Sequence, residues 1–175
     1  MAKKWLVLFV LLIVSTASDT VYTYYSPILM ERADFETAIQ LHHTPKPITN
    51  PGTLCLYRNW VLLVEQYKGV HLIDNSDPAN PVNKGFLTIP GCTDVAVRND
   101  VFYVNSAVDL VGVNVDFTAL TATELSRQKG ILPNLATPNG YVPEYIMEKC
   151  TSGEYVLVGW VKVNASGIIN SSFNE

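Results

Sequence analysis

Three histidines are the side chains in this sequence best suited to acid–base or metal chemistry. His42 and His43 are adjacent in a polar junction ahead of Pro45, and His71 lies in an apolar segment. A hydrolase needs a nucleophile with an orienting base, and histidine is the usual base. Adjacent side chains tend to point apart, so we expect solvated junction residues at 42 and 43. Alternation along a strand predicts that His71 faces opposite to Val70 and Leu72.

Acidic side chains at the ends of predicted strands are the second candidate set. Converging carboxylates could bind a cation or a carbohydrate, but at strand ends they more often cap turns, and that is our interpretation. The run 74–81 lacks the ligand spacing of an EF-hand loop, so it predicts a turn rather than a calcium site. The acids concerned are Glu65, Asp74, Asp94 and Asp109.

The sequence contains no GxSxG, HExxH or CxxC motif and no glycine-rich phosphate loop. We therefore predict no catalytic residue, no cofactor and no metal site, and a protein that is not an enzyme. The alternative is a metal-dependent or hydrolytic site formed by loop acids with His42, His43 or His71. Tight metal retention during purification would favour that alternative.

Tyrosines indicate a binding surface, because they offer a large amphipathic contact area with little side-chain entropy to lose. Together with loop acids they form the predicted interaction surface, which consists of Tyr24, Tyr25, Tyr67, Asp74, Asp77 and Asp109. Trp60 and Trp160 are assigned to the core.

The segments that must position these side chains are predicted to be short β-strands. Residues 57–61 resemble 97–101, and residues 70–74 resemble 110–114, an offset of about 40 residues. In each copy, β-branched and aromatic runs are separated by turn residues. Four strands in such a period are typical of a β-propeller blade. We predict an all-β fold of antiparallel four-stranded units, with one short helix near the N-terminus.

The predicted β repeat domain covers residues 53–163. A lead-in over residues 18–52 is expected to be extended, with an amphipathic helix at about 30–41, where apolar residues recur every three or four positions. A flexible tail is expected at 164–175. Within the repeat domain the expected units are blade 1 at about 53–90, blade 2 at about 93–127 and a partial third unit at 140–163.

The first residues have the layout of a secretory signal peptide. Lys3 and Lys4 precede an uncharged run at 5–14, and small residues follow up to Ala17. A ten-residue apolar helix rises about 15 Å, half of the roughly 30 Å that a spanning helix crosses. We predict cleavage after Ala17 and an exported chain that is periplasmic, cell-surface or extracellular, with no transmembrane span after cleavage. Retention of residues 1–17 as an anchor is the alternative.

Charge and cysteine content limit the partners and the redox chemistry. The net charge is -4 and the basic residues are scattered, which argues against a nucleic-acid partner. Three cysteines, Cys55, Cys92 and Cys150, allow at most one internal disulfide, so disulfides do not define the fold.

The pentapeptide Val70-His71-Leu72-Ile73-Asp74, with the turn 75–81 after it, resembles the bacterial LVIVD repeat proteins, and Leu110 to Asn114 resembles them more loosely. Five further elements resemble the N-terminal part of members from Bacteroidetes-type bacteria: Ser26-Pro27, Met30 to Ile39, Asn50-Pro51-Gly52, Gly69 to Asn75 and Val158-Gly159-Trp160. The resemblance implies a secreted or surface-exposed β-propeller-like protein of no established activity, as an N-terminal portion or shortened member. Many members carry a lipid-anchoring cysteine after the signal, where this sequence has Ser18. A lipid anchor is therefore not supported.

Two units and a fragment are fewer than the four to eight blades of a closed propeller. Unpaired blade edges invite association. Three arrangements remain open: a small sandwich, a homo-oligomer joined through blade edges, or a shortened relative of a longer protein. The function we favour is an exported, non-catalytic binding or structural module that contacts a protein or glycan partner.

Overall fold

The computed structural model describes residues 23–140 and 143–164. The chain divides by compactness into the unit Tyr25–Val161 and a unit made of the terminal segments 1–24 and 162–175. The predicted signal peptide and all but the first residue of the predicted tail lie outside the described residues.

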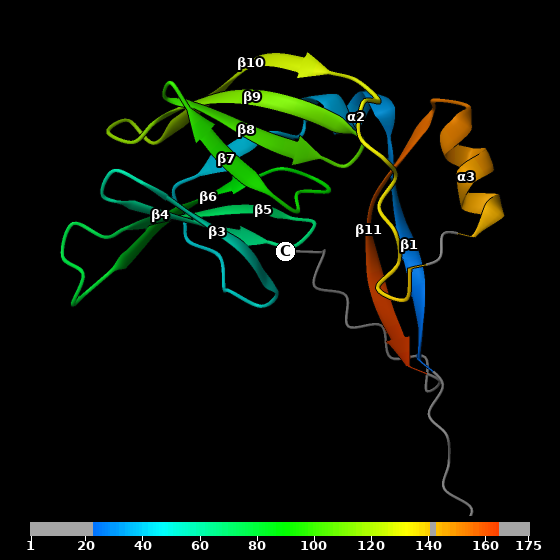
Figure 1. The fold of residues 1–175 in the computed structure, drawn as a ribbon, viewed down its shortest axis with the longest axis horizontal. Helices are drawn as coiled ribbons and strands as arrows, with labels where there is room; N and C mark the ends of the chain where they lie inside the picture. Colours follow the sequence, from blue (N-terminus) through cyan, green and yellow to red (C-terminus); the bar gives the residue numbers. More distant parts are fainter. Residues whose placement is uncertain (1–22, 141–142, 165–175) are drawn as a thin grey trace, which may run out of the picture. The chain divides into compact units, whose positions relative to one another are not determined.

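The described part of the chain is mainly antiparallel β-structure, as predicted, with a short helix near its N-terminal end (Figure 1). Sheet 1 has the strand order β2-β6-β5-β4-β3, sheet 2 has the order β10-β9-β8-β7, and β1 pairs with β11 in a ribbon. The helices are α2 (Arg32–Thr37) and α3 (Glu144–Thr151). The strands are β1 (Thr23–Glu31), β2 (Gln40–His42), β3 (Pro51–Tyr57), β4 (Trp60–Glu65), β5 (Gly69–Asp74), β6 (Val82–Thr88), β7 (Val95–Arg98), β8 (Val101–Ser106), β9 (Asp109–Asp116), β10 (Thr121–Gln128) and β11 (Tyr155–Asn164).

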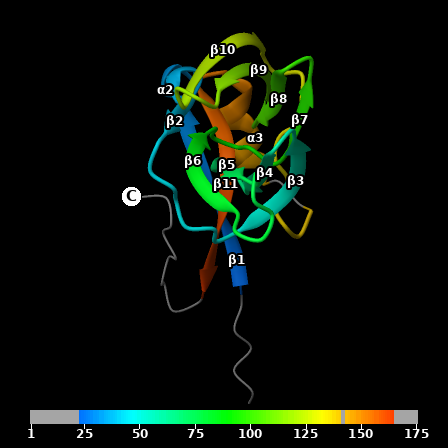
Figure 2. The same cartoon turned by 90° about the vertical axis from the view of Figure 1, so that its left-hand side faces the viewer.

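Sheets 1 and 2 pack face to face around one aliphatic core. Leu62 and Val64 of β4 and Val104 and Val111 of the second sheet are fully buried in it. Strand β3 lies against β7, and β10 lies against β2. Figure 2, turned by a quarter from Figure 1, shows the two sheets one above the other. The two sheets therefore make a two-layer packing of the kind that the sandwich alternative describes.

The offset of 40 residues holds on the second strand of each sheet. Leu62 and Val64 of β4 correspond to Phe102 and Val104 of β8, and all four point into the shared core. On the third strand the offset is 41, because Leu62 pairs with Leu72 whereas Phe102 pairs with Val113, so the predicted match of 70–74 with 110–114 is wrong by one position. On the first strand the offset is 42, because Cys55 pairs with Leu62 whereas Val97 pairs with Phe102. The reason is the position of the turn, which follows Tyr57 in sheet 1 but Arg98 in sheet 2.

The N-terminal helix is shorter than the predicted range 30–41, since Met30 belongs to β1 and Leu41 to β2. In β1 the side chains alternate between two clusters, with Ile28 and Met30 in one and Tyr25 and Leu29 in the other. Because both faces of this strand are covered, its residues show no apolar–polar alternation, and the three- and four-residue spacing that starts at Met30 gave no sign that Met30 itself belongs to a strand.

The predicted partial third unit at 140–163 is not a further four-stranded unit in the part of the chain that the structure describes. It consists of α3 and β11, and β11 pairs with β1. The helix was not predicted, and Gly140 and Pro143 before it are residue types that are more common in loops. Pro143 stands at the N-cap, outside the helix proper, where its missing N–H leaves no intrahelical hydrogen bond unmade.

Candidate functional site

His71 lies on the face of sheet 1 that points away from sheet 2, called here the outer face, and is 0% exposed. As predicted, it faces opposite to Val70 and Leu72, which are in the shared core. Its Nε2 is 3.3 Å from Oε2 of Glu65, and its Nδ1 is 3.2 Å from the amide nitrogen of Asn83. The amide donates to Nδ1, so Nε2 carries the proton and donates to the carboxylate.

Glu65, at the end of β4, accepts hydrogen bonds from the segment that joins β2 to β3. The backbone N–H of Asn50 donates to its Oε1 at 2.7 Å, and both the N–H and the hydroxyl of Thr49 donate to the same carboxylate. Burial raises the pKa of Glu65, but the hydrogen bonds from Thr49, Asn50 and His71 outweigh it, and the pKa is lowered. Burial lowers the pKa of His71. The hydrogen bond and the charge of Glu65 act in the opposite direction, but the net shift is downward.

The surroundings of His71 leave it no route to a substrate. The ring of Phe86 packs edge-on at 4.8 Å between centroids, and Nζ of Lys46 lies 4.9 Å from the centre of the Phe86 ring. Both imidazole nitrogens have partners, and the side chain has no exposed surface. The group therefore fastens the segment 46–50 to the outer face of sheet 1 and is not placed to act as a general base.

Asn105 of β8 makes the matching arrangement in sheet 2, at the 40-residue offset from Glu65. Its Oδ1 accepts the N–H groups of Thr93 at 2.9 Å and of Asp94 at 2.7 Å, and its amide donates to the hydroxyl of Thr93. In both sheets, therefore, a threonine and the residue after it are held by a side chain near the end of the second strand. Sequence reasoning missed this pair of contacts, although a Thr-Asx dipeptide precedes the first strand in both copies.

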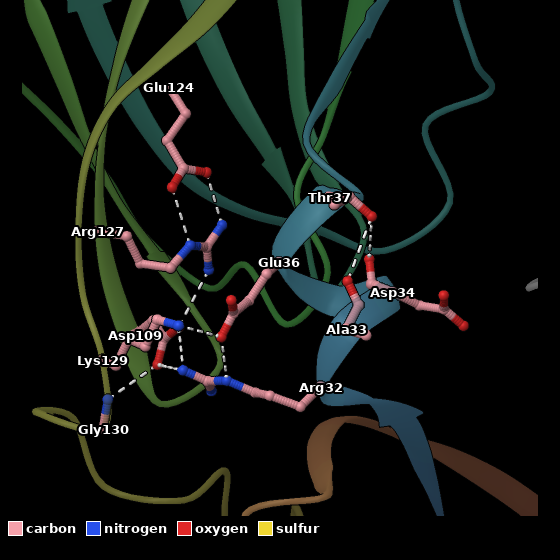
Figure 3. Close-up of polar contacts among 10 residues, drawn as sticks. All are labelled: Arg32, Ala33, Asp34, Glu36, Thr37, Asp109, Glu124, Arg127, Lys129 and Gly130. Atoms are coloured by element: carbon pink, nitrogen blue, oxygen red, sulfur yellow. Dashed lines mark hydrogen bonds and ion pairs between the residues drawn. The ribbon is translucent and has the colours of Figure 1, made fainter.

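Asp109 is buried at the start of β9 and lies between two arginines (Figure 3). Arg32 of α2 reaches its two oxygens at 3.1 and 2.9 Å, Arg127 of β10 reaches one at 3.1 Å, and the N–H of Gly130 donates at 2.9 Å. Both guanidinium groups also lie over the buried ring of Phe35, at 5.4 and 5.3 Å from its centre. This carboxylate therefore joins α2 to sheet 2.

The network around Asp109 is balanced in charge. Arg127 also binds Glu124 through two hydrogen bonds, while Arg32 and Lys129 both bind Glu36. Three cations thus face three carboxylates, in the arrangement that Figure 3 shows. A hollow of about 440 Å³ borders Arg32, Lys129 and Cys150, but its two cations already have carboxylate partners. The network leaves no net charge that would attract an ionic substrate.

The remaining candidate acids serve local turns. Asp74 accepts the N–H and hydroxyl of Ser76, and Asp77 accepts the N–H of Ala79 and the amide of Asn80. These hydrogen bonds hold the pKa of each of the two carboxyls below its usual value. Asp94 accepts the N–H of Val95. Among the described residues no group of three or more His, Cys, Asp or Glu could hold a metal ion.

The residues of the predicted interaction surface differ in exposure. Tyr24 belongs to the terminal unit and is 56% exposed. Tyr25 and Tyr67 are partly buried in a cluster around Trp160, and Asp109 is fully buried. The prediction is therefore wrong for Asp109. The error arose because the sequence shows that Asp109 is an acid at the end of a strand, but not that it pairs with Arg32, which lies 77 positions away in the chain. Trp160 is a core residue as predicted, and its Nε1 donates to the carbonyl of Leu135.

The outer face of sheet 1 carries an aliphatic patch that sequence reasoning missed. Leu56 pairs with Val61 and Val61 with Ile73 in one row across the strands, and Leu54 pairs with Leu63 in the next. Leu54 and Leu56 are 56% and 70% exposed. The available signal was the unbroken apolar run at 60–64, because a strand that faces water on one side alternates instead. The patch consists of Leu54, Leu56, Val61, Leu63 and Ile73.

Neither helix in the described ranges is long and apolar enough to cross a membrane. Comparison of the chain with protein-family models, with curated proteins and with solved structures found no match.

Proposed function

We propose that this chain is an exported, non-catalytic binding or structural module, built from two LVIVD-type, propeller-like β units, and that the aliphatic patch is its binding surface. The observation that carries the proposal is the contiguous patch on the outer face of sheet 1. Leu54 and Leu56 are exposed, and Val61, Leu63 and Ile73 beside them are half-buried. Aliphatic side chains that remain accessible to solvent as a group across neighbouring strands are typical of interaction sites. Aliphatic groups offer neither hydrogen bonds nor aromatic stacking, so a protein surface is favoured over a glycan.

The use of the polar side chains supports a module that is not an enzyme. Glu65 and His71 hold a neighbouring segment, and Asp109 holds a helix and a strand. Each of these side chains makes its hydrogen bonds to other groups of the same chain. The matched contacts of Glu65 and Asn105 at the 40-residue offset support the proposal of two repeated units. Export rests on the layout of residues 1–17.

The test is photo-cross-linking from the patch. A benzophenone amino acid is placed at position 56, and the full chain is irradiated in the envelope and secreted fractions of the producing cell. We expect a discrete cross-linked protein species from position 56. The matched control is position 103, where Tyr103 is exposed on the outer face of sheet 2. Equal labelling from both positions, or none from position 56, would contradict a binding role for the patch.

A further inference from the structure

We propose that His71, Glu65 and Asn83 form an acid-sensitive switch: when the ring of His71 takes up a proton on Nδ1, the segment 46–50 is released from the outer face of sheet 1. The segment returns when the pH rises and the proton leaves. The inference goes beyond the proposed function and does not depend on it, because it concerns what covers part of this face and not what binds the aliphatic patch.

The first argument is that the fold fixes the proton of His71 on Nε2. The backbone N–H of Gly85 donates to Oδ1 of Asn83 at 3.3 Å. A backbone N–H can only donate, so this contact turns the amide nitrogen of Asn83 towards Nδ1 of His71, 3.2 Å away. Nδ1 must therefore accept, and Nε2 carries the single proton and donates to Glu65. The site is complete with a neutral imidazole.

The second argument is that a proton on Nδ1 has no acceptor in this arrangement. Two N–H donors would face each other, and the ring has no exposed surface at which water could accept. The amide of Asn83 can turn its oxygen to Nδ1 only by leaving the N–H of Gly85. Gly85 lies at the irregularity in the β5–β6 pairing, where a Cβ would be 2.7 Å from the carbonyl oxygen of His42. The disturbance therefore reaches the end of β2, from which the chain leads into the segment 46–50.

The third argument is electrostatic. Burial, the largest effect, lowers the pKa of His71, the hydrogen bond and charge of Glu65 raise it, and the two nearby lysines lower it further, so that the net shift is downward. The charged residue of β6, Lys84, is exposed and interacts with Asp74. The titratable groups that surround the ring come from four elements: Glu65 from β4, Lys46 from the segment, Lys68 from the β4–β5 turn and His42 from β2, beyond Phe86.

The fourth argument is that the segment 46–50 is held at its two ends. Nζ of Lys46 lies 4.9 Å from the centre of the Phe86 ring, and the other end donates to Glu65. The residues between these contacts are exposed, so release uncovers little of the core and sheet 1 stays folded. Leu63 of the patch, His71 and Phe86 pair in one row across three strands. Release of the segment therefore makes the ring of Phe86 accessible beside the aliphatic patch.

The closed and the released forms differ in how strongly His71 binds a proton. In the released form the imidazole is accessible and titrates near its usual pKa of about 6.5, whereas in the closed form its pKa is lower. Release therefore takes up a proton and is favoured as the pH falls below about 6.5. The pKa of Glu65 is lowered from 4.5, so its protonation favours release only below about pH 4.5. Between these two pH values the response belongs to His71.

The experiment is native-state amide hydrogen exchange, read by NMR between pH 5 and 7 and corrected for the intrinsic exchange rate at each pH. It uses the full chain in the form in which the producing cell releases it. The backbone N–H groups of Thr49 and Asn50 are the reporters, because both donate to Glu65. We expect their opening equilibrium constant to rise by up to about tenfold for each pH unit below 6.5, which is the effect of one proton.

The matched control lies in the same molecule. Asn105 holds the N–H groups of Thr93 and Asp94 in the corresponding place of sheet 2, through an amide that does not titrate. Their opening equilibrium constant should stay the same between pH 5 and 7.

Two substitutions test the role of each partner. His71→Gln keeps a donor for Glu65 but cannot take up a proton, so the pH response of the reporter amides should disappear. Asn83→Asp keeps the acceptor for the N–H of Gly85 and provides one for Nδ1, so acidification should no longer raise the opening equilibrium constant. His42→Gln removes the neighbouring imidazole and should leave the response unchanged. Far-UV circular dichroism checks that each variant is folded.

Several results would overturn the proposal. Opening of the reporter amides that is constant between pH 7 and 5 would do so, as would an equal rise at Thr93 and Asp94, which would indicate general loosening of the fold. A response that persists in folded His71→Gln, or that is lost in His42→Gln, would mean that another group takes up the proton.

Discussion

At the scale of single residues, we expect substitution of Asp109 to lower the stability of the fold strongly. It is buried between Arg32 and Arg127, and it also accepts the N–H of Gly130. Asp109→Asn keeps the size of the side chain but leaves two guanidinium groups without this counter-charge and turns an amide donor towards them. We expect the free energy of unfolding to fall by about 3–5 kcal/mol, the usual cost of breaking a buried ion pair from one side. Urea denaturation followed by circular dichroism measures it.

The matched control makes the same chemical change at an exposed carboxylate. Asp77 accepts the N–H of Ala79 and the amide of Asn80 within its own exposed turn. Asparagine keeps the contact with Ala79, and water can accept from the exposed amide of Asn80. Asp77→Asn should therefore leave the urea midpoint nearly unchanged. If Asp109→Asn behaved like this control, the network in Figure 3 would contribute little, and α2 would be held mainly by the packing of Phe35.

The outcomes for single residues show what a sequence reveals about such sites. The turn roles of Asp74 and Asp77 could be predicted, because their partners lie within three positions. The orientation of His71 followed from strand alternation alone. The partners of Asp109 could not be predicted, since Arg32 is far away in sequence and nothing local distinguishes a buried strand-end acid from an exposed one. Long-range ion pairs depend on the packing of elements, which the pattern of one chain does not specify.

At the scale of elements, the strands of both sheets were predictable and the connections to the ribbon were not. Runs such as Val70–Asp74 are short, β-branched and bounded by turn residues, so their strand character is local information. Strand β1 is different, because its pairing partner β11 comes from the other end of the described chain. The aliphatic patch was missed for a related reason. The alternation of apolar and polar residues indicates which face of a strand is buried. Because β4 is apolar on both faces, it shows no such alternation.

The contact of Asn105 allows a prediction about how sheet 2 is held at its entry. Asn105→Leu has nearly the same shape but removes the acceptor for the N–H groups of Thr93 and Asp94. Leaving two such donors without this partner should lower the free energy of unfolding by roughly 1–3 kcal/mol. Amide hydrogen exchange at Thr93 and Asp94 should also become faster, which a general loss of packing in sheet 2 would not produce selectively.

The control for this element is Asn114→Leu, a change of the same chemistry at an exposed position on β9. It should affect neither the urea midpoint nor exchange at positions 93 and 94. If Asn105→Leu proved equally silent, the Thr-Asx contact would not stabilise the unit, and the correspondence with Glu65 would lose its weight as support for repeated units.

At the scale of the larger unit Tyr25–Val161, the ribbon is tied to the two sheets at several points. The N–H of Arg32 donates to the carbonyl of Glu154 at 2.8 Å, at the junction of β1, α2 and β11. Tyr67, in the turn between β4 and β5, packs in the cluster of Leu157 and Trp160. The backbone N–H of Tyr67 donates to the backbone carbonyl of Cys92. Opening of β11 would therefore uncover side chains that also hold sheets 1 and 2.

These ties predict that the ribbon and the sheets open as one cooperative unit. Native-state amide hydrogen exchange, read by mass spectrometry, should give the same opening free energy for Leu157 in β11 as for Val70 and Leu72 in β5. Val158→Ala, in the buried cluster with Phe35, should lower all three values by one common amount, whereas exposed Val82→Ala should lower none. A drop confined to β11 would mean that the ribbon unfolds separately, and that sheets 1 and 2 stay folded through their shared core alone.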